Sequence, residues 1–277
     1  MGSISDHLED ELLDHVFNAS YTPPSTVYLA LSTADPGDDA AGISEPVGNN
    51  YSRKAITFDA AASRLINQTS TVTFDQATGS WGTISHWAIY DASSGGNMMA
   101  HGSLSASKAV VSGNTPSVAA GEVDISFKTL ASKGDTTNNV SDYLADELLD
   151  FAFRNQAFSE PATYLALCTA DLSDSSTGAT MTECANANGY ARKQVNVNGG
   201  SSPTWDLSSS GNVDNTHDIT FASPTGSWGT VTALVILDGG THGAGNVLFY
   251  DNGITEQTPD NGDTVKILAG NCDISLT

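Results

Sequence analysis

Apolar residues near the start of the chain recur at the spacing of an α-helix. Leu8, Leu12 and Val16 fall on one face of such a helix. Ser5, just before them, is a favourable N-cap residue, and Asp6 suits the positively polarised first turn. The pattern therefore predicts a short amphipathic helix of about three turns.

Beyond this helix the pattern changes to short runs of alternating, β-branched and aromatic residues. Gly, Pro, Asn or Asp bounds each run, which is typical of strands joined by turns. The runs predict strands over residues 27–33, 55–58, 71–74, 84–91, 97–103 and 122–127. So many strands favour a sandwich or a compact barrel.

The whole pattern occurs twice. ISDHLEDELLDHVF at 4–17 matches VSDYLADELLDFAF at 140–153, an offset of 136 that also holds for the strand VYLALSTAD at 27–35. The offset then grows to 139 at YSRK, 147 at TGSWGT and 149 at AAGEVDISF. Insertions therefore fall between matched blocks, as expected for surface loops.

The repeat predicts a mostly β chain of two tandem homologous domains, each a β-sandwich or barrel with a short N-terminal amphipathic helix. The first domain covers 1–127, and the second copy covers 140–277 and has longer loops. Residues 128–139 between them have the small, polar composition of a linker. Each domain is large enough to fold alone.

The net charge of the chain excludes some classes of binding partner. The chain carries 32 acidic and 10 basic residues, a formal net charge of -22, which repels nucleic acid phosphates and anionic lipid. No apolar run approaches the length of a membrane span, and the N-terminal sequence lacks the pattern of a secretion signal. We therefore expect neither a nucleic acid nor a membrane partner.

Acidic side chains are the first candidates for chemistry. Three carboxylates recur in both predicted helices: Asp10, Glu11 and Asp14, and Asp146, Glu147 and Asp150. An acid–base pair needs an apolar pocket that separates the two pKa values, and nothing nearby in the sequence supplies one. We therefore interpret these carboxylates as a solvated helix surface.

Two Asp-rich loops could instead ligate calcium. They are DPGDD at 35–39 and DLSD at 171–174, and neither has the register of an EF-hand. Asp and Gly also dominate ordinary turns, so we assign these loops to turns and predict no metal site. The three cysteines have no metal-ligand spacing and are expected to be core residues rather than a structural disulfide.

Trp81 and Trp228 lie in the repeated GSWGT block. This block indicates a turn whose Trp covers the edge of a core. A sugar-stacking platform is the alternative. Motifs of nucleophilic, phosphate-binding, zinc and dinucleotide enzymes are missing, so we predict no enzyme, no catalytic residue and no cofactor.

Imidazole chemistry is not expected of the shared fold, because no position is His in both copies. Ala233 stands where His86 does, and we expect His86, beside Trp87, to be a packing residue. The remaining histidines occur in one copy each: His7, His15, His101, His217 and His242.

The matched blocks carry a resemblance. They include YTPPSTVYLALSTADP, YSRKAITF, TGSWGTISHWAIYDASSGGNMMAHGSL and VAAGEVDIS. The chain resembles a family of small tailed-phage structural proteins, often labelled tail fibre proteins. The resemblance implies the helix, the YLAL-type strand, the GSWGT turn and a closing strand, and it implies a virion protein, made in the host cytoplasm and exposed on the particle. It brings no catalytic residues.

These observations predict a non-enzymatic structural protein of a tailed phage virion. Because the chain lacks a long repetitive shaft, we favour a capsid decoration protein on the head surface. Its expected partners are the major capsid protein or tail proteins of the same virion, and further copies of itself in a homo-oligomer. The alternatives are a tail fibre or tail-tip component, and a carbohydrate-binding adhesion module that contacts a host surface glycan through side chains such as Trp87.

Overall fold

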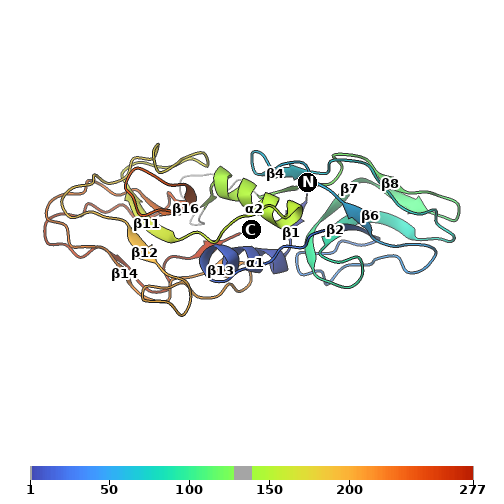
Figure 1. Cartoon of the computed structure of the whole chain (residues 1–277), viewed down its shortest axis with the longest axis horizontal. Helices are drawn as coiled ribbons and strands as arrows, with labels where there is room; N and C mark the ends of the chain where they lie inside the picture. The colour runs from blue at the N-terminus through green and yellow to red at the C-terminus, as the bar shows by residue number, and fades with distance from the viewer. Residues whose placement is uncertain (1, 128–138, 277) are drawn as a thin grey trace.

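The computed structural model describes residues 2–127, the first half, and 139–276, the second half. The halves lie end to end in an elongated molecule, with both helices near the middle (Figure 1). Most of the predicted linker, 128–138, lies outside the described residues. Its last residue, Asn139, instead pairs with Tyr250 as part of a strand.

The first half begins with a two-residue strand and a helix and is otherwise built of strands. Its elements are β1 (Ser3–Ile4), α1 (Asp6–Phe17), β2 (Val27–Ser32), β3 (Lys54–Ile56), β4 (Leu65–Asn67), β5 (Val72–Thr73), β6 (Gly82–Tyr90), β7 (Met98–Val110), β8 (Ser117–Val118) and β9 (Asp124–Ser126). An antiparallel sheet has the order β1-β7-β6-β2-β3, and two small ribbons pair β4 with β9 and β5 with β8.

The second half repeats these elements in the same order. They are β10 (Asn139–Val140), α2 (Asp142–Arg154), β11 (Thr163–Cys168), β12 (Lys193–Val195), β13 (Asn212–Val213), β14 (Ile219–Thr220), β15 (Ala233–Leu237), β16 (Val247–Asp251), β17 (Lys266–Ile267) and β18 (Ile274–Ser275). The sheet order β10-β16-β15-β11-β12 and the ribbons β13–β18 and β14–β17 reproduce those of the first half. The predicted mostly β, tandem fold with a helix near the start of each copy is confirmed.

Both helices begin as their sequences predict. The Ser5 hydroxyl accepts a hydrogen bond from the Leu8 amide, and Ser141 does the same for Leu144. These caps satisfy amide groups that a helix start otherwise leaves without partners. The apolar helix faces are buried against the sheets, so each helix is fixed at its start and along one side.

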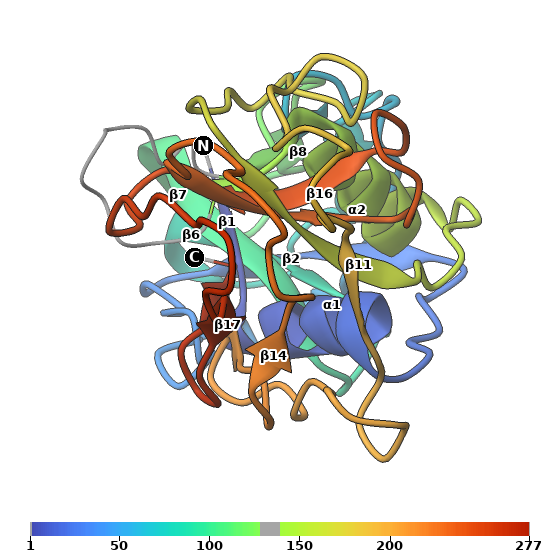
Figure 2. The same cartoon turned by 90° about the vertical axis from the view of Figure 1, so that its left-hand side faces the viewer.

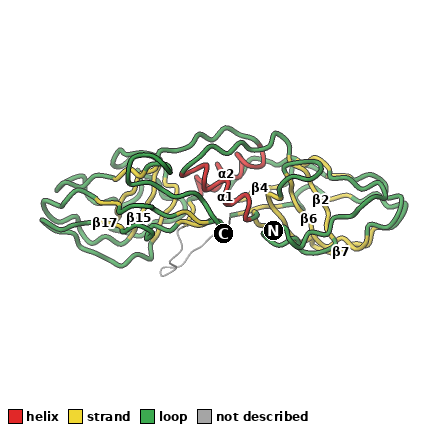
Figure 3. The backbone as a smooth tube through the Cα atoms, turned by 90° about the horizontal axis from the view of Figure 1, so that it is seen from below, coloured by secondary structure: helices red, strands yellow, loops and turns green. Residues whose placement is uncertain are grey.

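The helices also pack across the middle of the molecule. Helix α1 contacts β7 of its own half and β13 of the second half, whereas α2 contacts β16 of its own half and β4 of the first. Viewed from below, the two helices lie together between the sheets (Figure 3). From the second-half end, β11 and β16 lie in front of them (Figure 2). One apolar core consequently includes residues of both halves.

Candidate functional site

The contact between the halves is the most elaborate polar site of the described chain. We call it the joint, and it has two parts: α1 against the loop at 205–211, and α2 against the loop at 58–64. The loops are equivalent, because they are related by the offset of 147 that also relates the two GSWGT blocks. Each half thus supplies one helix and one loop.

Carboxylates of α1 hold the backbone of the second-half loop. Asp10 Oδ1 accepts hydrogen bonds from the Ser208 hydroxyl at 2.7 Å and from the Gly211 amide at 2.8 Å. Asp10 Oδ2 is 3.3 Å from the Ser210 amide nitrogen. One turn later, Asp14 accepts from the Ser208 amide at 2.7 Å. Charged acceptors make the stronger class of hydrogen bond, so these contacts fix the loop on the helix.

The other part of the joint repeats this geometry. Asp146 accepts from the Arg64 amide at 2.7 Å, and Asp150 accepts from the Ala61 amide at 2.8 Å. The interpretation of the helix carboxylates as a solvated surface was therefore wrong for these four aspartates. Helical periodicity identifies the face of a helix, but it does not show that a loop of the other copy covers that face.

Aromatic rings fill the space between the polar contacts. Phe17 packs on Trp205 with ring centroids 4.8 Å apart. At the equivalent positions, Phe153 packs on Phe58 at 5.6 Å. His15 and its own equivalent, Phe151, stack on each other at 4.3 Å. Equivalent residues meet in this way only near a local two-fold axis, so the halves form a pseudo-symmetric pair.

One ion pair breaks this symmetry. The guanidinium of Arg64 is 3% exposed and lies 2.8 Å from Asp174 and 3.9 Å from Asp142. The Tyr250 hydroxyl also donates to Asp174. Burial and the charge of Asp174 raise the pKa of Asp142, which the nearby guanidinium opposes. The equivalent of Arg64 is Gly211, which has a positive φ as Arg64 does.

The Asp-rich loops divide between turns and ion pairs. Asp35 accepts from the Gly37 amide and Asp39 from the Ala41 amide, which are local turn contacts. Asp38 lies 2.7 Å from His101, and Asp174 belongs to the joint. Within residues 2–127 and 139–276, no group of three or more His, Cys, Asp or Glu side chains is placed to hold a metal ion.

The tryptophans lie inside the fold, as the interpretation of GSWGT as a core-covering turn predicts and against the sugar-platform alternative. Trp81 and Trp228 are 4% and 3% exposed, and their indole groups donate to the carbonyls of Asn49 and Asn188. Trp87 is completely buried. None of these three rings can stack on a sugar unless the core opens.

The cysteines lie in the core, whereas His86 is partly exposed and has polar neighbours, with its Nε2 3.9 Å from Asp35. Cys168, Cys184 and Cys272 are free and buried, and burial raises the pKa of the Cys168 thiol to about 12. His86 bonds to its neighbour, Ser85, at 2.8 Å.

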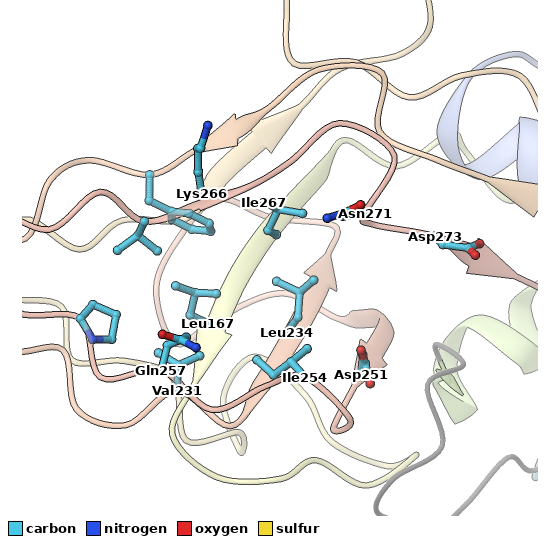
Figure 4. A pocket seen from close by; sticks show the side chains of 13 residues that line it. Leu167, Val231, Leu234, Asp251, Ile254, Gln257, Lys266, Ile267, Asn271 and Asp273 are labelled. Carbon is cyan, nitrogen blue, oxygen red and sulfur yellow. The ribbon is translucent and has the colours of Figure 1, made fainter.

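Each half also contains a cavity at an equivalent place between its sheet and its outer ribbon. The second-half cavity is about 250 Å³ and the first-half cavity about 230 Å³. Leu167, Leu234 and Ile267 surround the larger one, with Asp251 and Asp273 toward one end (Figure 4). Leu31 occupies the position of Leu167 in the smaller one.

A family model described as "Podophage GP4 fiber I protein gp80" matches residues 3–126 and again 139–275. The chain belongs to this family. Among curated proteins, no sequence matches it. Family membership makes the chain a structural protein of a phage particle. The helices within the described ranges are all too short or too polar to span a membrane.

The two family matches coincide with the two halves, so each family unit contributes one helix and one loop to the joint. Sequence reasoning found the helix residues but missed their partners, chiefly Phe58, Arg64, Trp205, Ser208 and Gly211. A signal was present, because 58–64 and 205–211 are related by the same offset as the GSWGT blocks.

Proposed function

We propose that this chain is a component of the podophage tail fibre, in which it serves as a non-enzymatic structural module. The observation that carries the proposal is the joint, which combines two units of a fibre family into one elongated body (Figure 1). A fibre needs modules that are stiff along their length, and the paired helices and loops resist bending at the middle of this one.

The joint also weakens the argument for a capsid decoration protein. That expectation depended on the lack of a repetitive shaft in the sequence. A module whose two units meet end to end supplies length without such a shaft. The family description, which names a fibre, supports the same preference. The partners that we propose are other proteins of the fibre.

Immunogold labelling of intact particles tests the location. Antibodies raised against the purified chain are expected to mark the tail fibres in negative-stain electron microscopy. An antibody against the major capsid protein, applied to the same particles, is the control for labelling of the heads. Gold from the chain-specific antibody distributed over the heads, with none on the fibres, would refute the fibre location and support decoration.

A further inference from the structure

The joint has the composition of an interface between separable proteins. Its centre contains aromatic pairs, including Phe17 with Trp205 and Phe153 with Phe58. Hydrogen bonds between helix carboxylates and loop amides surround this centre. An apolar, aromatic centre inside a polar rim is the usual arrangement of protein–protein interfaces, where Trp and Arg are frequent anchors.

Each half has its own complete set of paired strands. Every strand pair of the described chain joins strands of the same half, so no sheet continues across the joint. The loop amides that the aspartates hold belong to surface loops, where water can replace the carboxylates on separation. Separation therefore exposes an apolar patch and a few polar groups but breaks no sheet.

Arg64 makes a second half bind a first half in preference to another second half. In the joint its guanidinium offsets Asp142 and Asp174 of the second half. If two second halves paired in the same way, Gly211 would stand at the position of Arg64, because these residues are equivalent. Asp142 and Asp174, whose side chains are 39% and 23% exposed, would then lack that cation, so a pair of second halves loses an ion pair and binds less tightly.

We propose that the joint is a docking interface, through which a second half binds a first half of its own chain or of another copy. A second half binds another second half less tightly in this way. The joint can consequently connect one chain to the next.

The test uses the full chain with a protease site inserted between residues 128 and 138. The folded protein is cleaved, and a preparation with an affinity tag on the first half is mixed with an untagged preparation labelled with heavy isotopes. The tagged material is then recovered, and mass spectrometry measures the labelled second halves. We expect the cleaved halves to remain a one-to-one complex on size exclusion and labelled second halves to exchange into it toward the mixing ratio.

Variants distinguish reversible docking from cleaved halves that merely never separate. Arg64→Met is expected to raise the dissociation constant of the cleaved halves at least tenfold, whereas Lys108→Met, an exposed change in the same half, leaves it unchanged. If Arg64→Met does not fold, Asp10→Asn provides the same comparison. Three results would each overturn the proposal: tagged first halves that keep only their original partners, second halves that pair with each other as readily as with first halves, or an unchanged constant in a folded Arg64→Met or Asp10→Asn chain.

Discussion

Replacing Asp10 by alanine removes the carboxylate that receives three groups of the second-half loop. Two of these contacts are short, the Ser208 hydroxyl at 2.7 Å and the Gly211 amide at 2.8 Å. A hydrogen bond to a charged group contributes about 1.5–3 kcal/mol. Water can reach this half-buried site after the change, and alanine favours the helix by roughly 0.5 kcal/mol, so we expect a net loss of about 2–3 kcal/mol.

Chemical denaturation followed by fluorescence measures this loss as a change in the free energy of unfolding. In a thermal melt the same loss lowers the midpoint by about 4–10 °C for a chain of this size. Glu11→Ala is the matched control, because it removes a carboxylate from the next position of the same helix. We expect the control to change the free energy by less than about 0.5 kcal/mol.

A double-mutant cycle isolates the contact itself. Ser208→Ala in the Asp10→Ala background is expected to cost about 1 kcal/mol less than in the unmodified chain, because the two residues share a hydrogen bond. If Asp10→Ala and Glu11→Ala destabilise equally and the cycle shows no coupling, Asp10 does not hold the loop and the reasoning about the joint is refuted.

Three further predictions concern the interior of the halves. Glu183→Gln leaves the buried Arg192 without its carboxylate and should lower the free energy of unfolding, measured in urea, by about 3–5 kcal/mol. Glu45→Gln, in the more exposed equivalent pair with Arg53, should lower it clearly less, and equal losses would contradict this prediction. Burial alone would raise the pKa of Glu183, but the hydrogen bonds and charge of Arg192 outweigh burial and lower this pKa. The ion pair therefore contributes fully to stability above about pH 4.5, and this contribution disappears as the pH falls through the lowered pKa. In Glu183→Gln, this part of the acid-induced loss of stability should be absent. The three thiols are buried, and burial raises the pKa of Cys184 to about 11, so they should react with a thiol reagent at pH 8 only after unfolding. Fast reaction of the native chain would contradict the buried positions of the cysteines.

The sequence predicted local features well where they depend on neighbouring residues. The helix caps at Ser5 and Ser141 follow from residue type and position, and the repeated order of elements follows from the matched blocks. Three strands of two or three residues, β1, β4 and β8, were missed, because so few residues show a period only when the neighbouring residues extend the pattern, as they do at β3, β5 and β9. The strand predicted at 97–103 continues to Val110, but residues 105–109 are small or polar and exposed, so they lack the buried apolar positions that mark a strand in sequence.

The joint could not be predicted in the same way. Apolar residues on α1 show that one side of it is buried, but they do not show which copy of the fold covers the remaining sides. Asp10 and Asp14 look like solvated residues in sequence because their partners, such as Ser208, lie nearly two hundred positions away. Only the pairing of two equivalent halves about the stacked His15 and Phe151 brings these residues together.

Native-state hydrogen exchange of the intact chain tests the joint most directly. The amides of Ala61, Arg64, Ser208 and Gly211 belong to loops, and each donates to a helix carboxylate of the opposite half. We predict that these four amides are protected to a similar degree and that all four lose protection together when Asp10 and Asp146 are both replaced by alanine. Exchange of all four at the rates of unprotected loops in the unmodified chain would contradict the joint.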